Sequence, residues 1–173
     1  MTRVWMLGLL FSVSGLSAAA AFSSSGGATA DDADFKAFLT RFEEGTSRFI
    51  NGDAGLWKEN ASHRDDVTLM GGWGTSERGW AEAGARYDWA AQRFEKSGAT
   101  LKVEYLSSAV SGDLAYTVAI EQSEVRLVGQ TAPAKMALRV SHVFRREDGA
   151  WRMIHRHADP LMSTTSADSV LKK

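Results

Sequence analysis

The sequence predicts a single α+β domain in which N-terminal helices pack on one face of a mostly antiparallel sheet. Three observations support this fold class. Helical periodicity is confined to the first half of the chain, strand-like runs fill the second half, and Gly-containing turns join these runs into hairpins. The chain has 173 residues, which is enough for one domain with a substantial core and too few for two comfortable ones.

Composition narrows the chemistry that this domain can perform. The chain is 44% hydrophobic and 24% charged, as is typical of soluble globular proteins. Its net charge of -1 provides no basic field that would favour nucleic acid, so no nucleic-acid partner is expected. The absence of cysteine excludes disulfides, thiolate nucleophiles and cysteine-ligated metals.

The N-terminal segment has the pattern of an export signal. Arg3 precedes an apolar run over residues 4–16, and the alanines at 18–21 offer small-residue cleavage positions. The run is too short to span a bilayer as a stable helix. Residues 1–21 are therefore predicted to be a cleaved signal peptide, with an uncleaved membrane anchor as the alternative. The mature protein would be periplasmic or secreted and would meet the membrane only during export.

Two further segments are expected to lack regular structure. Residues 22–33 are rich in Ser, Gly and Ala without periodicity, which indicates a disordered lead-in. The polar segment 161–173 is expected to be a flexible tail.

Three helices are predicted from apolar spacing and capping residues. Asp31 or Asp32 can cap the first, whose apolar positions recur every three or four residues: Phe35, Phe38, Leu39, Phe42 and Phe49. Asp53 can cap a short second helix through Leu56 and Trp57. Ser76 is the expected cap of a third helix that runs from Arg78 to about Phe94.

The remaining segments are predicted to be strands. One short strand is expected at Val67–Trp73. Four longer runs are rich in Val, Tyr and Ile: Leu101–Val110, Leu114–Val128, Lys135–Arg146 and Trp151–Ala158. Ser111-Gly112-Asp113 and Glu147-Asp148-Gly149 are the hairpin signals.

A specific register is predicted for the last hairpin. A three-residue loop with Gly149 in the left-handed region would pair Arg146 with Ala150, Ser141 with His155 and Arg139 with His157. Paired side chains share a face, so the four polar residues of the last two pairs would form one patch, continued by Val143, Trp151 and Met153. A shift of one residue would bring His142 onto that face instead.

The same hairpin carries a family resemblance. Between Leu138 and His157 the chain has Arg139, then Arg145-Arg146-Glu147-Asp148-Gly149, then Trp151 and a His155-x-His157 pair. This segment resembles the closing hairpin of SnoaL-like proteins, members of the nuclear-transport-factor-2-like (ketosteroid-isomerase-like) superfamily. The pattern is most similar to the association domain of calcium/calmodulin-dependent kinases, and the resemblance covers residues 34–160.

The resemblance implies a cone-shaped fold in which three helices and a bent sheet enclose a pocket, in a homodimer or larger assembly. The superfamily includes isomerases, dehydratases, cyclases and epoxide hydrolases beside binding and oligomerisation modules, so the fold leaves the function open. The chain departs from the kinase pattern because it has an export signal, no kinase domain, and Asp159 where a hydroxyl residue is common. A role as a kinase assembly domain is therefore excluded.

The histidine pair is the first candidate site. His155 and His157 would lie on one face of a strand, about 7 Å apart, where they could act as a catalytic acid/base pair with Asp159 orienting one ring. The alternative is that the two imidazoles satisfy buried hydrogen bonds or lie at a dimer interface. Pairs of this kind without a third known ligand arise often by chance, so no metal site is predicted.

Arg139 is the second candidate, because an arginine in mid-strand is costly unless it is paired or faces a ligand. It could clamp a carboxylate or enolate beside Ser141, or form a salt bridge with Glu121, Glu124 or Asp159. Five aromatic residues are candidates for the ligand-binding wall: Trp57, Trp73, Tyr87, Tyr105 and Tyr116. Steroid-isomerase chemistry is disfavoured because the first helix carries phenylalanines where that enzyme has a tyrosine.

Two functions therefore remain open. The domain binds a small, partly apolar organic ligand, neutral or anionic, or serves for assembly. Alternatively, it is a cofactor-independent lyase or isomerase, dehydratase- or cyclase-like, with a His/Asp acid-base pair and Arg139 as anion clamp. No cofactor is predicted in either case. A homodimer is expected through the outer face of the sheet, which Val140, Phe144 and Ile154 would leave partly apolar.

Overall fold

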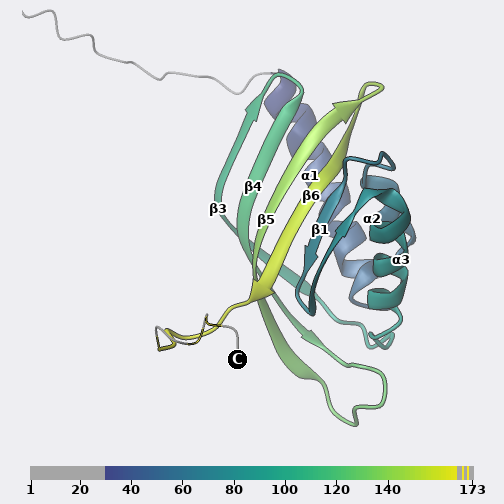
Figure 1. The fold of residues 1–173 in the computed structure, drawn as a ribbon, viewed down its shortest axis with the longest axis vertical. Helices are drawn as coiled ribbons and strands as arrows, with labels where there is room; N and C mark the ends of the chain where they lie inside the picture. The colour runs from purple at the N-terminus through teal and green to yellow at the C-terminus, as the bar shows by residue number, and fades with distance from the viewer. Residues whose placement is uncertain (1–29, 167–168, 170, 172–173) are drawn as a thin grey trace, which may run out of the picture.

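The computed structural model describes residues 30–166, 169 and 171 (Figure 1). The expected signal peptide at 1–21 and most of the expected lead-in lie outside the described residues. The first helix begins at Ala30, so residues 30–33 of that lead-in are helical. None of the described helices is long and apolar enough to cross a membrane.

The order of elements is that of the predicted α+β fold, apart from the strand at Gly74–Arg78, which was not predicted. The described residues form α1 (Ala30–Phe49), α2 (Gly55–Asn60), β1 (Thr68–Gly71), β2 (Gly74–Arg78), α3 (Gly79–Ala91), β3 (Leu101–Ser111), β4 (Leu114–Val125), β5 (Ala134–Glu147) and β6 (Ala150–Pro160). The strands make one sheet in the order β2-β1-β6-β5-β4-β3. Neighbouring strands are antiparallel except β1 and β6, which are parallel.

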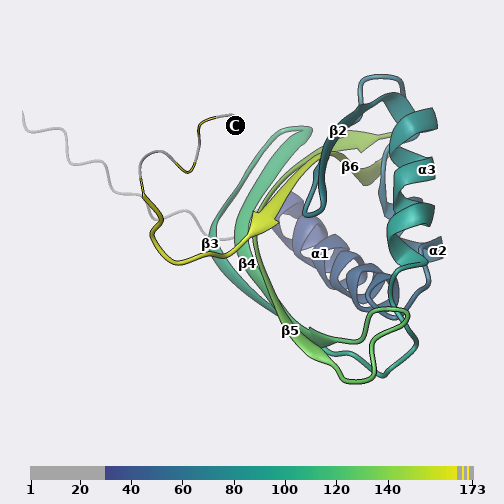
Figure 2. The ribbon, with the colours of Figure 1, turned by 60° about the horizontal axis from the view of Figure 1, so that its bottom comes forward.

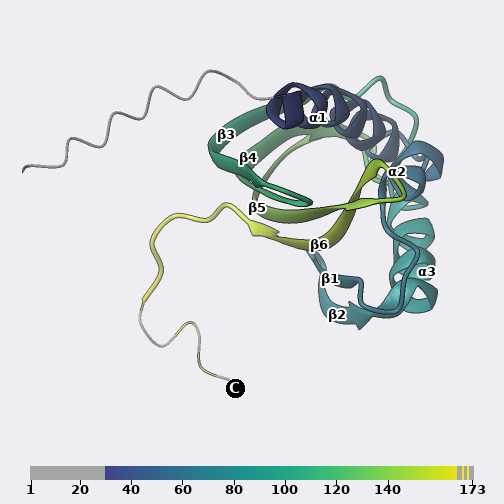
Figure 3. The ribbon, with the colours of Figure 1, turned by 90° about the horizontal axis from the view of Figure 1, so that it is seen from above.

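The sheet is strongly bent, and its concave face turns toward the helices (Figures 2 and 3). Helix α1 runs across the concave side of β3 and β4, while α3 closes the side near β1 and β2. This arrangement is the cone predicted from the family resemblance, and none of the helices that the structure describes covers the convex face of the sheet.

The core between α1 and the sheet is aromatic. Phe35, Phe38 and Phe42 lie one turn apart on α1, and each ring is 5.3 or 5.4 Å, centroid to centroid, from the ring of Phe144 in β5. Edge-to-face contacts at this spacing add to the free energy gained by burying the rings. The three- and four-residue spacing read from the sequence therefore identifies the buried face of α1.

Two helix starts differ from the predicted caps. At α2 the N-cap is Ala54 rather than Asp53, although the Asp53 carboxylate accepts the backbone N–H of Gly55 at 2.8 Å. The prediction that Ser76 caps the third helix is wrong, because Ser76 lies within β2. Gly79, at φ 74°, turns the chain from β2 into α3, and the backbone N–H of Arg78 donates to the Glu82 carboxylate.

The register of the closing hairpin also differs from the prediction. Glu147 pairs with Ala150, so the loop is the two-residue turn Asp148-Gly149, with φ of 51° and 80°. Positive φ at both central residues is the type I′ geometry that Asp-Gly favours. The predicted three-residue loop is therefore wrong.

A β-bulge in the same hairpin decides which residues face the helices. Phe144 pairs with Met153 but Val143 pairs with His155, so Ile154 is an extra residue in β6. An extra residue reverses the direction of every side chain beyond it. Trp151 and Met153 consequently face the core, whereas the histidines at 155 and 157 face outward.

The faces of β5 follow from this pairing. Val140 and Phe144 are 2% and 0% exposed because they face the helices. The expectation that they make the outer face apolar is therefore corrected.

Candidate functional site

A cavity of about 580 Å³ lies between the concave face of the sheet and the helices. This volume falls within the range of small-molecule sites in proteins. Most of its wall is apolar and comes from α1, α3, β4 and β5, including Phe49, Ile50, Leu69, Ala90, Phe94, Val125, Met136 and Leu138. The exposed Trp73 and Lys135 are also part of the wall, so they mark the side on which the cavity opens.

A buried ion pair forms the polar part of this wall. The Arg156 guanidinium donates to both carboxylate oxygens of Glu121, at 3.0 and 2.7 Å. Arg156 is 8% exposed and Glu121 is 6% exposed, and the guanidinium carbon lies 5.1 Å from the centre of the Trp57 ring. The two charges therefore compensate each other inside the domain, away from bulk water.

His142 extends this network into the core. Its Nε2 accepts from Arg156, and its Nδ1 lies 3.3 Å from the Thr117 hydroxyl. Because a guanidinium can only donate, the ring proton belongs on Nδ1. Burial, followed by the nearby charges of Arg156 and His155, holds the pKa of His142 well below its usual value, so the ring is neutral.

Two further polar groups beside the cavity have, within the described chain, no partner other than each other. The Trp57 indole N–H interacts weakly with the Tyr87 oxygen, and both residues are at least 97% buried and line the cavity. Burial raises the pKa of the Tyr87 phenol, so it is protonated. The Tyr87 hydroxyl proton is left without an acceptor, which costs about 1–3 kcal/mol and which a ligand oxygen or a water molecule could recover.

The opening of the cavity carries a second arginine. Arg86 of α3 lines the wall, with its guanidinium carbon 4.0 Å from the centre of the Trp89 ring. Its Nε is 3.5 Å from a Glu77 oxygen, and its Nη2 is 3.4 Å from the carbonyl oxygen of Gly74. Both separations exceed the usual length of a charge-assisted hydrogen bond.

The structure separates the predicted site residues into two groups. Trp57, Trp73 and Tyr87 line the cavity, as predicted for the ligand-binding wall. Tyr105 shares the inner side, where its hydroxyl donates to Glu43 of α1 at 2.7 Å. The remaining predicted residues point to the outer face of the sheet and do not line this cavity: Arg139, Ser141, Tyr116, His155, His157 and Asp159.

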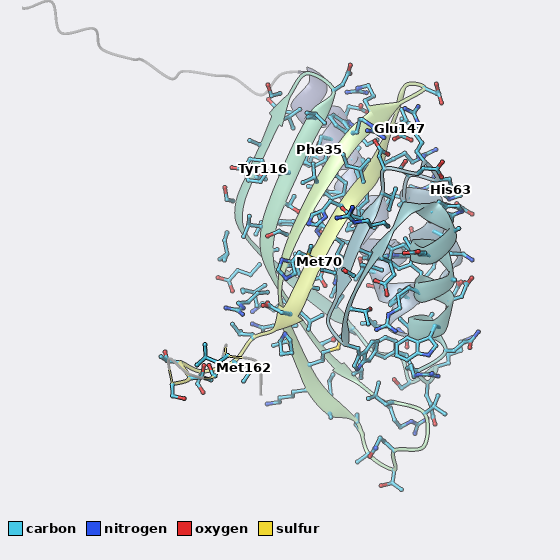
Figure 4. The ribbon with its side chains drawn as sticks, viewed as in Figure 1. Phe35, His63, Met70, Tyr116, Glu147 and Met162 are labelled. Atoms are coloured by element: carbon cyan, nitrogen blue, oxygen red, sulfur yellow. The ribbon has the colours of Figure 1, made fainter. Side chains whose placement is uncertain are left out.

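The outer group is held by surface interactions. Arg139 forms two hydrogen bonds with Asp159, at 3.0 and 2.7 Å, which is one of the salt bridges considered from the sequence. The Nδ1 of His155 lies 2.7 Å from the Thr68 hydroxyl. The Tyr116 hydroxyl lies 3.0 Å from the Ser107 hydroxyl on the same face (Figure 4, where Tyr116 is labelled).

The expected pocket floor is thereby corrected. Arg139 and Ser141 do share a face with the two histidines, because the turn and the bulge together shift the predicted pairs by two residues. That face is the convex one. A shallow groove beside the β1–β2 hairpin includes His157 and Asp159, but it is separate from the enclosed cavity.

The sequence did not predict, as site residues, the ion pair of Glu121 and Arg156 in the cavity wall or the His142 ring behind it. His142 alternates with Val140 and Phe144, and this period-two pattern could have placed it on the buried face. Arg156 had no such signal, because the bulge at Ile154 breaks the alternation in β6. The sequence suggested Glu121 only as a possible salt-bridge partner of Arg139.

No metal centre is evident in the part of the chain that the structure describes. No three His, Asp or Glu side chains among the described residues come together in a way that could hold an ion. What the cavity offers instead is an apolar space with a buried ion pair, a Tyr87 hydroxyl that lacks an acceptor, and two cations in its wall, Arg86 and Lys135. Such a space can bind and orient an organic molecule.

Comparison with known structures identifies the fold. A nuclear-transport-factor-2-like protein from Salmonella enterica is 19% identical, with a TM-score of 0.65 over 79% of this chain and 95% of that one. A proposed dehydratase of the same family from Streptomyces avermitilis is 18% identical, with a TM-score of 0.60 over 76% and 96%. A proposed calcium/calmodulin-dependent protein kinase type II association domain from Thiobacillus denitrificans is 22% identical, with a TM-score of 0.57 over 73% and 94%. At these identities the likeness concerns the fold alone.

Comparison of sequences gives the family. Curated protein sequences return no match. The model of the SnoaL-like domain matches residues 60–163, which include every strand from β1 to β6. Because this match spans more than half of the sequence, the chain belongs to the SnoaL-like domain family.

Proposed function

We propose that this domain binds a small, largely apolar organic molecule in the cavity between the bent sheet and the helices. The observation that carries the proposal is the mostly apolar cavity of about 580 Å³, with the Tyr87 hydroxyl, which lacks an acceptor, beside it. A ligand with one neutral oxygen acceptor would fill the apolar space and satisfy a donor that otherwise lacks a partner.

Blocking the cavity tests this proposal. Ala90 of α3 is 8% exposed and lines the cavity, so Ala90→Phe should fill part of it. Ala85 lies on the same helix but is exposed, which makes Ala85→Phe the matched control. The probe is N-phenyl-1-naphthylamine, a neutral dye whose fluorescence rises in apolar surroundings.

The wild type and Ala85→Phe should bind one dye per chain with the same affinity, and Ala90→Phe should lose binding while remaining folded by circular dichroism. Absence of saturable binding to the wild type, or unchanged binding to folded Ala90→Phe, would contradict the proposal.

A second candidate function is a cofactor-independent lyase or isomerase. The observation in its favour is the Glu121 carboxylate in the cavity wall, where it could accept a proton from a bound substrate. The proposed dehydratase from Streptomyces avermitilis has the same fold. However, both oxygens of Glu121 already accept bonds from Arg156, which stabilises the charged form and weakens the carboxylate as a base.

Turnover can be tested separately from binding. A panel of β-hydroxy carbonyl compounds that displace the dye would be incubated with the protein and analysed by mass spectrometry for the loss of one water. Water loss that disappears in Glu121→Gln while displacement persists would establish the enzyme. Compounds that bind without any mass change would leave ligand binding as the function.

We further propose that the protein is exported before it binds its ligand. The proposal rests on the apolar run at residues 4–16 and the small residues at 18–21. Intact-mass measurement on protein from the native compartment should give a mature chain that begins near Ala21 or Phe22. A mass that retains Met1 would contradict export by cleavage.

A further inference from the structure

The two arginines that line the cavity differ in how completely their charges are compensated. Arg156 makes two bonds of normal length to Glu121 and a third to His142, so its guanidinium is occupied. The charge of Glu121 is compensated in return. The inner part of the cavity therefore carries no net charge that would attract an ionic ligand group.

Arg86 is in the opposite situation. Its side chain is only 18% exposed, yet its sole polar contacts within the described chain are the 3.5 Å approach to Glu77 and the 3.4 Å contact to the Gly74 carbonyl oxygen. Glu77 compensates part of the charge, but its oxygen Oε1 also accepts a 2.6 Å bond from the Thr75 hydroxyl. A guanidinium has five N–H donors, so most of those of Arg86 remain available.

Packing holds Arg86 in place for a ligand. The guanidinium stacks on the Trp89 ring, and Arg93 stacks on the same ring at 4.1 Å. Trp89 in turn contacts Trp73, the exposed aromatic residue of the cavity wall, with 5.9 Å between ring centres. Stacking leaves the edge of the guanidinium free to donate in its plane. Arg86 is therefore a positioned cation near the opening of an apolar cavity.

We propose that the ligand is an amphiphilic carboxylic acid whose carboxylate pairs with Arg86 while its apolar body lies in the cavity. The inference rests on the ligand-binding function proposed above and adds the chemical class and the orientation. A planar carboxylate fits the fork of the guanidinium. The reverse orientation would bury a carboxylate beside Glu121 without a free cation, which is costly.

The test compares two rigid probes that differ in charge at nearly constant shape, 2-naphthoate and 2-naphthamide. Their affinities are measured by isothermal titration calorimetry at pH 7.5. Wild-type protein should bind the carboxylate about tenfold or more tightly than the amide, since charge-assisted bonds are about twice as strong as neutral ones.

The variant Arg86→Met removes the charge and keeps most of the side-chain volume. It should bind the two probes within about twofold of each other, with affinity for 2-naphthamide close to that of the wild type. Arg93→Met is the matched control, because Arg93 stacks on the same tryptophan but does not line the cavity. It should keep the wild-type preference. Arg86→Lys, which keeps the charge without the fork, should retain part of the preference and serves if Arg86→Met fails to fold.

The outcomes separate this inference from the proposed function. Equal binding of the two probes by the wild type would overturn the carboxylate assignment and leave an apolar binding cavity. An equal loss of preference in the Arg86 and Arg93 variants would also overturn it, because long-range charge would then explain the effect. Failure of both probes and of N-phenyl-1-naphthylamine to bind the wild type would overturn the proposed function itself.

Discussion

At the scale of single residues, two arginine–carboxylate pairs with similar hydrogen bonds differ in how deeply they are buried. The side chains of Arg156 and Glu121 are 10% and 7% exposed, whereas those of Arg139 and Asp159 are 59% and 42% exposed. Both pairs are bidentate. Loss of one partner leaves an uncompensated charge in the first pair and a solvated charge in the second, so their contributions to stability differ.

Methionine substitutions should reveal this difference. Arg156→Met leaves Glu121 buried without its counter-charge and should lower the free energy of unfolding by about 3–5 kcal/mol. Arg139→Met, the matched surface control, should lower it by less than about 1 kcal/mol. Urea unfolding followed by tryptophan fluorescence measures both values. Similar small losses in the two variants would mean that the Arg156 pair is hydrated or dispensable.

Buried His142 should make stability depend on pH. Its pKa is held below 6.5 by burial and by Arg156, and burial lowers the pKa of His155 in the same direction. Below pH about 6.5 the unfolded chain takes up protons that the folded chain does not, so stability should fall as the pH falls. The slope should approach about 1.4 kcal/mol per pH unit for the buried His142, and the partly exposed His155 should add less because solvent screens its ring.

Below pH 6.5 the variant His142→Gln should show a smaller dependence of stability on pH. The slope should fall by at most the contribution of one proton, about 1.4 kcal/mol per pH unit. His63→Gln, at an exposed position stacked on Trp80, is the control for the loss of a surface histidine. Urea unfolding at a series of pH values gives the slopes. A slope that is unchanged in His142→Gln would contradict the assignment of a buried neutral imidazole.

At the scale of elements, the β-bulge at Ile154 decides which face of β6 reaches the cavity. Before the bulge, Trp151 and Met153 point inward, and after it Arg156 and Ala158 do so. A regular strand would have placed His155 and His157 in the interior, which was the prediction. The bulge is thus the local cause of the difference between the predicted and observed polar walls.

A one-residue shift of the chain after the bulge should therefore be far more damaging than truncation of the Ile154 side chain. Insertion of one alanine between His155 and Arg156 would turn Arg156 outward and His157 inward, which removes the ion pair and buries an unpaired imidazole. We expect this variant to be unfolded or destabilised by more than about 4 kcal/mol. Ile154→Ala keeps the chain length and should remain folded, with a loss of at most about 2 kcal/mol because Ile154 is only half-buried.

Thermal unfolding of the insertion variant and of Ile154→Ala, followed by circular dichroism, makes this comparison. An insertion variant that melts within a few degrees of Ile154→Ala would show that the strand can shift its register without penalty.

At the scale of the whole molecule, the convex face of the sheet lacks a covering layer (Figure 3). Leu114 and Tyr116 are 51% and 40% exposed on this face, and Tyr116 pairs directly with the half-buried Val143. Apolar side chains gathered on an open sheet face are typical of protein interfaces. The homodimer expected from the sequence therefore remains a prediction, with these residues in place of Val140 and Phe144 as its apolar contacts.

A charge on this face should separate the predicted dimer. We expect wild-type protein at micromolar concentration to have twice the monomer mass by multi-angle light scattering. Tyr116→Asp should shift it to the monomer, because a desolvated carboxylate would oppose its symmetry-related copy. Val128→Asp, at a 60% exposed position after β4, should keep the dimer mass. A monomeric wild type, or equal behaviour of the two variants, would contradict the predicted interface.

The sequence alone determined the fold class, the order of the described elements apart from β2, and the buried face of α1. These features depend on short-range patterns: the spacing of Phe35, Phe38 and Phe42 on α1, and the Gly-containing turns that join the long strands. Family resemblance in the closing hairpin also identified the cone-shaped fold. Of the five aromatic residues proposed for a ligand-binding wall, Trp57, Trp73 and Tyr87 line the cavity, whereas Tyr105 and Tyr116 do not.

Only the tertiary structure decided which polar residues face the cavity. One extra residue in β6 reverses the direction of the side chains that follow it, and no local signal in the sequence marks its position. The partner of Arg156 lies 35 positions away on β4, and Arg86 reaches the cavity because α3 packs across the sheet. Pairing across strands depends on the whole sheet, whereas the patterns that predict helices and turns are complete within a few residues.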